Sequence, residues 1–127
     1  MIDHVTINVS NFEKSKDFYL KALKPLGYGL IREFAEWRVA GFGAGGKPDL
    51  WIHTQTDALP QGIHIAFAAE DKKIVEEFYK AALSAGGKDN GKPEYQKDYG
   101  PGYFGAFVFD PDGHNIEAVF RDPSPTK

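Results

Sequence analysis

Two histidines and one glutamate have the residue types of a metal site. His4 and His64 lie 60 positions apart, each near the start of a segment that alternates like a β-strand. Glu117 lies inside an apolar stretch, where an unpaired carboxylate would cost several kcal/mol. A divalent ion would offset that cost, because two imidazoles and one carboxylate leave coordination positions open for substrate. The alternative is that each histidine is a hydrogen-bonded strand residue near the surface and that Glu117 is an edge-strand carboxylate in water or in a salt bridge.

An internal repeat relates the two histidines. A shift of 60 residues places His4 on His64. The same shift superposes Phe18-Tyr19 on Phe78-Tyr79, Ala22-Leu23 on Ala82-Leu83, and Gly27 on Gly87. Neither packing nor solubility requires a histidine at both equivalent sites. We therefore predict two copies of one supersecondary unit, whose histidines can converge if the two sheets face each other across a cup.

Each copy has the pattern of one strand, one helix and three further strands. Residues 2–9 and 62–69 alternate as strands do, and an apolar stripe at helical spacing follows each of them. Ser10 and Glu13 predict a capping box at the start of the first helix. The remaining strands are predicted at 28–34, 36–42 and 48–54, and at 88–95, 103–109 and 114–121.

The predicted fold class is α+β. Two pseudo-symmetric βαβββ modules, 1–54 and 62–121, are joined by a linker at 55–61. Together they are expected to form one domain over residues 1–127, with a cup-shaped mixed sheet of eight strands.

The last strands of the two copies align Trp51 with Glu117. Their neighbours match as the packed face, so Trp51 and Glu117 are predicted to face the cup. By the same alternation Tyr103 and Phe107 share that side, and Arg38 is placed on a neighbouring strand. Aromatic walls with a few polar groups suit a small, partly apolar ligand. The alternative is that these rings simply belong to the core.

Composition limits the classes of protein that remain. Hydrophobic residues make up 42% and aromatic residues 14%, too much ring surface for a disordered chain. The net charge of −3, with both signs interspersed, suggests neither a nucleic-acid partner nor a basic membrane face. No cysteine is present, which excludes disulfides, thiolate nucleophiles and cysteine zinc sites. Without a leader pattern or an apolar run of roughly 20 residues, we predict a cytoplasmic protein.

Three segments resemble one known superfamily. His4-Val5-Thr6, Gly62-Ile63-His64 and the run from Asp110 to Glu117 are together similar to the vicinal-oxygen-chelate proteins, which include glyoxalases, bleomycin-resistance proteins and extradiol dioxygenases. The resemblance spans nearly the whole chain. It implies that His4, His64 and Glu117 hold a divalent metal (Zn, Mn, Ni or Fe) in the cup. It also implies a homodimer, in which His4 can meet His64 and Glu117 across the interface.

Individual members of the superfamily differ from this chain at informative positions. Glyoxalase I has a glutamate as a fourth ligand where Trp51 stands, while His53, two residues on, faces the same way and could act as a base. Extradiol dioxygenases and fosfomycin-resistance thiol transferases have a tyrosine where Phe107 stands. The thiol transferases share the pattern His4-x-Thr6, which makes Thr6 a candidate hydrogen-bond partner.

These resemblances lead to three functional hypotheses. The first is a metal-dependent enzyme that activates a small oxygenated substrate by Lewis-acid chemistry of the lyase, isomerase or thiol-transferase type. His53 and Thr6 would be its catalytic candidates, and Trp51, Tyr103, Phe107 and Arg38 its substrate-binding candidates. The second is a bleomycin-resistance-like protein that binds a small or drug-like molecule without metal. The third is a fosfomycin-resistance-like transferase.

Overall fold

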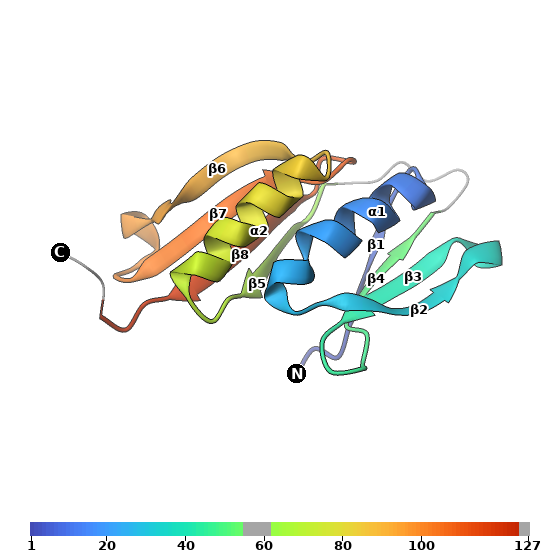
Figure 1. The fold of residues 1–127 in the computed structure, drawn as a ribbon, viewed down its shortest axis with the longest axis horizontal. Coiled ribbons are helices and arrows are strands. Elements are labelled where there is room, and N and C mark those ends of the chain that lie inside the picture. Colours follow the sequence, from blue (N-terminus) through green and yellow to red (C-terminus); the bar gives the residue numbers. More distant parts are fainter. Residues whose placement is uncertain (55–61, 125–127) are drawn as a thin grey trace.

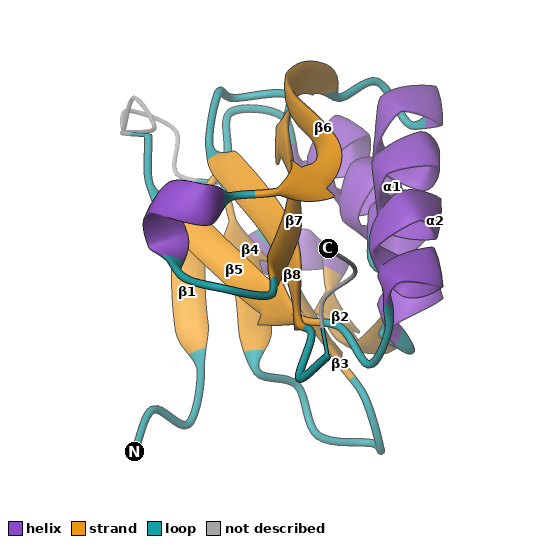
Figure 2. Ribbon diagram, turned by 90° about the vertical axis from the view of Figure 1, so that its left-hand side faces the viewer, coloured by secondary structure: helices purple, strands orange, loops and turns teal. Residues whose placement is uncertain are grey.

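Two βαβββ modules form the molecule. The computed structural model describes residues 1–54 and 62–124, so the linker predicted at 55–61 lies outside the described residues. The strands form two four-stranded mixed sheets, and each sheet carries one α-helix (Figure 1). A side view shows both helices on the same face of the sheets (Figure 2). The predicted α+β class and the two-module arrangement are confirmed, with the eight strands divided between two sheets.

The first module has the strand order β1-β4-β3-β2, with β1 parallel to β4 and the other pairs antiparallel. Its elements are β1 (Val5–Asn8), α1 (Phe12–Ala22), the 3-10 helix η1 (Lys24–Leu26), β2 (Gly29–Phe34), the 3-10 helix η2 (Ala35–Trp37), β3 (Val39–Gly43) and β4 (Leu50–His53).

The second module repeats this plan in the order β5-β8-β7-β6. Its elements are β5 (His64–Ala68), α2 (Lys72–Ser84), β6 (Lys88–Tyr95), the 3-10 helix η3 (Lys97–Tyr99), β7 (Tyr103–Phe109) and β8 (Asn115–Arg121). Again the first and last strands of the module, β5 and β8, pair in parallel.

Strand register confirms the alignment of the two copies. In the first module Thr6 pairs with Trp51, and in the second Ala66 pairs with Glu117. Since Thr6 and Ala66 are 60 residues apart, Trp51 and Glu117 occupy equivalent positions, as predicted. Successive strand residues point to opposite faces, so both side chains lie on the face away from the helices.

The start of α1 differs from the predicted capping box. Asn11 is the N-cap, and its side chain accepts a hydrogen bond from the backbone N–H of Lys14 at 3.0 Å. The prediction that Ser10 and Glu13 cap the helix was therefore wrong. Ser10 instead donates its backbone N–H to Asp112 of the other module at 3.0 Å. Ser10 follows β1 by two residues and joins the two modules instead of capping the helix.

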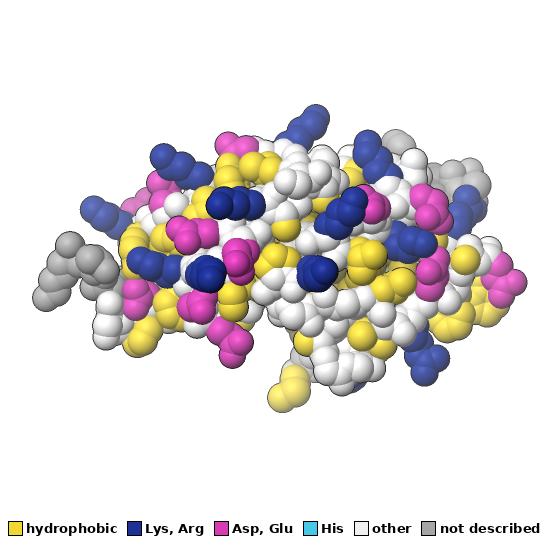
Figure 3. All heavy atoms as spheres, in the orientation of Figure 1, with side chains coloured by type: hydrophobic (Ala, Val, Ile, Leu, Met, Phe, Trp, Pro, Cys, Tyr) yellow, Lys and Arg dark blue, Asp and Glu magenta, His cyan; other side chains and the backbone are white. Residues whose placement is uncertain are grey.

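The core lies between the sheets and the helices. α1 and α2 pack side by side, and α2 also packs on β7 and β8 (Figure 1). The fully buried apolar side chains include Phe18, Tyr19, Leu23, Phe42, Ile52, Val75, Phe78, Val108 and Ile116. Positive and negative side chains are interspersed over the helical face (Figure 3). Neither α-helix of the described segments is long and apolar enough to cross a membrane.

Gly87 lies where both modules meet, and this position leaves no room for a side chain. A Cβ atom there would lie 2.5 Å from Val108 Cγ1 in β7 and 2.8 Å from the ring of Phe18 in α1. We expect Gly87→Ala to lower the free energy of unfolding by about 1–3 kcal/mol, because the surrounding core must shift. Denaturant unfolding would measure this loss.

Gly29→Ala is the matched control for that substitution. A Cβ atom on Gly29 would meet nothing within 4 Å, and the backbone there is not in the left-handed region. We expect this variant to change stability by less than about 1 kcal/mol. Equal unfolding midpoints for the two variants would contradict the close packing at Gly87.

Candidate metal and ligand site

Glu117 is a fully buried carboxylate with two hydrogen-bond partners. It has 0% exposure although it lies on the face away from the helices. Its Oε1 is 2.8 Å from Nε2 of His64, and its Oε2 accepts a hydrogen bond from the Tyr103 hydroxyl. An ionised Glu117 only accepts hydrogen bonds, so Nε2 of His64 carries the proton in this contact. The first and last strands of the second module thus bring an imidazole and a carboxylate together.

Tyr103 and Phe107 surround this pair. Burial and the hydrogen bond to Glu117 raise the pKa of Tyr103 to about 12, so its hydroxyl stays protonated at neutral pH. Phe107 pairs with Glu117 in the sheet, and its ring centroid is 6.3 Å from that of His64. Between them, Gly105 leaves the space that a side chain would fill, since a Cβ atom there would lie 3.1 Å from Glu117 Oε2. Four of the predicted site residues therefore lie together, in what we call the glutamate cluster: His64, Glu117, Tyr103 and Phe107.

The predicted residues of the first module form a second group. His4, Thr6, Trp51 and His53, together with Val39, line one hollow of about 280 Å³. We call this the tryptophan hollow. The indole ring of Trp51 lies over Gly41, where a Cβ atom would be 2.8 Å from the ring. Thr6 and Trp51 are direct partners in the parallel pair of β1 and β4.

His4 is oriented by its neighbour in sequence. It precedes β1, which begins at Val5, yet it lines the same hollow as Thr6, on the side that alternation predicted. Its Nδ1 is 2.9 Å from the Asp3 carboxylate, which also binds Lys47. The hydrogen bonds from Lys47 and from His4 lower the pKa of Asp3. The side chain of His4 is 52% exposed.

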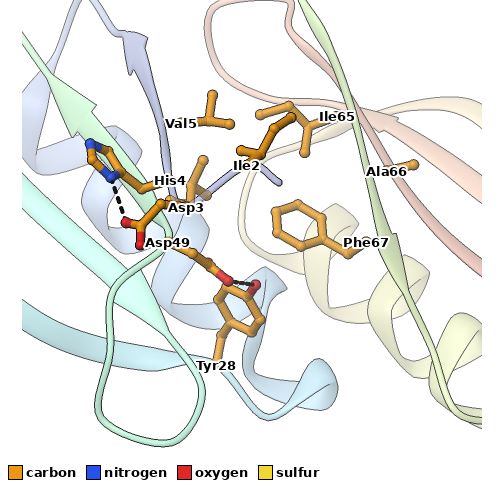
Figure 4. A pocket seen from close by; sticks show the side chains of 10 residues that line it. Ile2, Asp3, His4, Val5, Tyr28, Asp49, Ile65, Ala66 and Phe67 are labelled. Atoms are coloured by element: carbon orange, nitrogen blue, oxygen red, sulfur yellow. Dashed lines mark hydrogen bonds and ion pairs between the residues drawn. The ribbon is translucent and has the colours of Figure 1, made fainter.

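Asp3 and His4 also border a hollow between the two modules. This hollow of about 190 Å³ lies between β1, β4 and β5. Figure 4 shows Asp3 and His4 on one side of it and the apolar side chains of Ile65 and Phe67 on the other. His4 therefore borders both this hollow and the tryptophan hollow.

One placement differs from what the sequence suggested. Arg38 does not lie on a strand: it ends η2 with a φ of 53° and is exposed in the turn before β3. Within residues 1–54 and 62–124 of one protomer, no group of three side chains with ligand atoms within 4.8 Å of one another contains His4, His64 and Glu117. The structure thus brings His64 to Glu117 and leaves His4 in the other group.

A different cluster has the spacing of metal ligands. Ligand atoms of Asp110, Asp112 and His114 all lie within 4.8 Å of one another, a spacing that could hold an ion. The buried carboxylate of Asp110 already accepts three hydrogen bonds. They come from the backbone N–H groups of Asp112 and His114, at 2.9 and 2.8 Å, and from the Tyr19 hydroxyl at 2.6 Å. An ion would have to displace these donors.

We call these three residues, Asp110, Asp112 and His114, the junction cluster. His114 and Asp112 also form hydrogen bonds within the chain. Nδ1 of the buried His114 accepts from the backbone N–H of Ile63 at 3.2 Å, and its Nε2 lies 2.8 Å from the carbonyl of Asn8. Asp112 accepts from Ser10. These bonds connect the turn before β8 with the end of β1 and the start of β5. We therefore assign the junction cluster a structural role.

Tyr19 makes the stability of this junction depend on pH. Burial, and then the nearby Asp110 carboxylate, raise the pKa of Tyr19 well above its ordinary value. The unfolded chain ionises first, so the stability that Tyr19 contributes is complete below about pH 10 and is lost as pH rises from there. We expect Tyr19→Phe to cost about 1–2 kcal/mol at about pH 8. The gap to the unmodified protein should shrink at about pH 11, as measured by denaturant unfolding; a gap that widens would contradict this account.

The two repeated modules and the acidic site on their open face define the class of protein. The family model described as "Glyoxalase/Bleomycin resistance protein/Dioxygenase superfamily" matches residues 1–118, and the chain belongs to this family. The resemblance inferred from the three sequence segments is thereby confirmed. A search of curated proteins finds no match.

Solved structures agree with this assignment. A glyoxalase/bleomycin resistance protein from Albidiferax ferrireducens is 25% identical with a TM-score of 0.77, and the match covers 94% of this chain and 97% of that one. An integron cassette protein from the mobile metagenome of a Halifax Harbour sewage outfall is also 25% identical, with a TM-score of 0.70 and coverage of 94% and 97%. A lactoylglutathione lyase from Agrobacterium tumefaciens, at 16% identity, TM-score 0.68 and coverage of 94% and 92%, shows the shared fold alone.

Proposed function

We propose that the protein is a metal-dependent enzyme acting on a small oxygenated substrate. His64 and Glu117 of one protomer and His4 of a second copy would hold one divalent ion. The observation that carries this proposal is the fully buried carboxylate of Glu117, 2.8 Å from an imidazole nitrogen on the open face of the sheet. A buried carboxylate beside a histidine is the donor set that Zn²⁺, Mn²⁺, Ni²⁺ or Fe²⁺ takes.

When bound, the ion would supply Lewis-acid activation of adjacent substrate oxygens. Around it, the protonated Tyr103 hydroxyl can donate a hydrogen bond to Glu117 or to a substrate oxygen. Trp51 and Phe107 would form apolar walls, Thr6 would offer a hydroxyl, and His53 would act as the base.

One residue, Trp51, limits the reactions that the proposed site could perform. Trp51 stands at the position equivalent to Glu117, and an indole can neither bind a metal nor accept a proton. Proton transfer between two carboxylates is therefore disfavoured. Lyase or isomerase chemistry with His53 as the base, or addition of a thiol, suits these residues better. Arg38, in the exposed turn after η2, would reach a substrate only at the rim of the site.

The proposed enzyme is a cytoplasmic homodimer. Its helices share one face, and His4 lies in a different group from His64 and Glu117 within a protomer. A second copy would supply the missing imidazole if its tryptophan hollow faces the glutamate cluster. Light scattering should then give the mass of a dimer.

Mixing two defective variants tests the shared site. His4→Ala and Glu117→Ala each remove a ligand from both sites of a homodimer. A mixed dimer would keep one intact site, so random exchange should restore about a quarter of the zinc-binding sites. Isothermal titration before and after mixing measures this. No recovery despite proven subunit exchange would overturn the shared site.

One observation favours a second function, binding of a small molecule without metal. Both oxygens of Glu117 already have partners in His64 and Tyr103, so the cluster is satisfied by the chain itself. Elemental analysis of protein purified without chelators separates the two functions. The enzyme should contain about one ion per chain and melt at a higher temperature with added metal. Absence of both effects would favour the binding protein.

A further inference from the structure

The two candidate histidines are held in different ways. His64 is the first residue of β5, pairs with Asn115 and contacts Glu117. His4 lies before β1 and has no partner in the strand ladder. Its ring is held instead by the Asp3 carboxylate, 2.9 Å from Nδ1. The Asp3 carboxylate is therefore placed to set the tautomer of His4.

We propose that Asp3, held in place by Lys47, is a positioning residue that keeps the proton of His4 on Nδ1 and leaves Nε2 free to bind an ion. This inference rests on the proposed function, in which Nε2 of His4 binds the ion. The tautomer itself does not depend on any metal. Asp3 only accepts hydrogen bonds when ionised, so Nδ1 must be the donor. The lone pair of the neutral ring is then on Nε2.

The loop between β3 and β4 explains how Lys47 reaches Asp3. Gly45 and Gly46 have φ angles of 70° and 88°, in the left-handed region that favours glycine. A Cβ atom on Gly43 would lie 2.0 Å from the Lys47 carbonyl, so the loop folds back on itself there. This tight glycine-rich loop presents the Lys47 ammonium to the Asp3 carboxylate, which it contacts.

Stability alone gives little reason for this arrangement. The Asp3 and Lys47 side chains are 61% and 66% exposed, and ion pairs so exposed contribute little to stability. Replacing Asp3 should therefore leave the melting temperature almost unchanged. This makes the role of Asp3 separable from folding.

Nitrogen NMR of the metal-free protein tests the tautomer directly. At about pH 8, where most imidazoles are neutral, ¹⁵N spectra should show the His4 proton on Nδ1 in the unmodified protein and mainly on Nε2 in Asp3→Ala. Asp17→Ala is the matched control, because Asp17 forms a similarly exposed pair with Lys21 on α1. His4 protonated on Nε2 in the unmodified protein, or unchanged by Asp3→Ala, would overturn the proposal.

Zinc affinity then tests whether the contact between Asp3 and His4 supports metal binding. Asp3→Ala should weaken Zn²⁺ binding about 10-fold or more, as loss of a partner behind a ligating histidine does. Asp17→Ala should leave the affinity unchanged. Asp3→Asn keeps a carbonyl oxygen for Nδ1 and should recover most of the loss. Equal affinities for both alanine variants would overturn the proposal.

The two experiments can fail independently. An unmodified protein that binds no Zn²⁺ contradicts the proposed function. The tautomer of His4 in the metal-free protein still decides whether Asp3 positions the ring.

Discussion

Glu117→Gln should weaken divalent-ion binding by about 100-fold or more, the largest functional effect expected of a single substitution in this chain. Amide oxygens are far poorer ligands than carboxylates for the ions named here. Titration with Zn²⁺ and with Mn²⁺ would measure the loss. Glu76→Gln, an exposed position on α2, is the control for the charge change and should bind as the unmodified protein does.

The same substitution should leave the metal-free protein folded. The amide oxygen can accept from Tyr103, and its N–H can donate to the other tautomer of His64. We therefore expect the metal-free stability to change by less than about 1 kcal/mol. Undiminished ion binding by a folded Glu117→Gln protein would remove Glu117 from the ligand set.

Asp110→Ala should have the largest effect on stability, a loss of about 3–5 kcal/mol. The substitution leaves the buried Tyr19 hydroxyl and the backbone N–H groups of Asp112 and His114 without their acceptor. Each unsatisfied buried group costs about 1–3 kcal/mol. Denaturant unfolding at neutral pH measures the total.

Asp110→Asn separates the hydrogen bonds from the charge. Its amide oxygen can still accept from both backbone groups, so the loss should be about 1–2 kcal/mol. If Asp110→Ala cost no more than Asp110→Asn, the junction cluster would not hold the modules together. Unchanged metal binding in Asp110→Asn would agree with a structural role for this cluster.

Much of the fold could be predicted because it follows from two regularities of the sequence, the alternation of residues along strands and the internal repeat. Alternation at every second residue gave the strand 103–109 with the bounds that β7 has, and the offset of 60 residues paired the modules. The same alternation correctly grouped Tyr103, Phe107 and Glu117 on one face. These predictions concern residues inside strands, where the backbone fixes the side-chain direction.

The predictions that differ concern residues outside the strands. Arg38 ends a 3-10 helix with a positive φ, so alternation does not apply to it. The N-cap at Asn11 was missed because Ser10 has the residue type of a cap but bonds across to Asp112.

Some residues that shape the site were not predicted at all. Gly41 and Gly105 lie inside strands and leave room for Trp51 and Glu117, a role that mid-strand glycines can signal. Asp3 and Lys47 are far apart in sequence, and the folded loop between β3 and β4 brings Lys47 to the Asp3 carboxylate that contacts His4. No periodic pattern in the sequence predicts such a contact.

Anomalous diffraction at the zinc edge, from crystals of the zinc-saturated protein, tests the central claim most directly. We expect one strong peak per protomer beside the imidazole of His64 and the carboxylate of Glu117, with His4 of a neighbouring copy as the third ligand. A peak at Asp110, Asp112 and His114 instead, or no peak next to Glu117, would contradict the account.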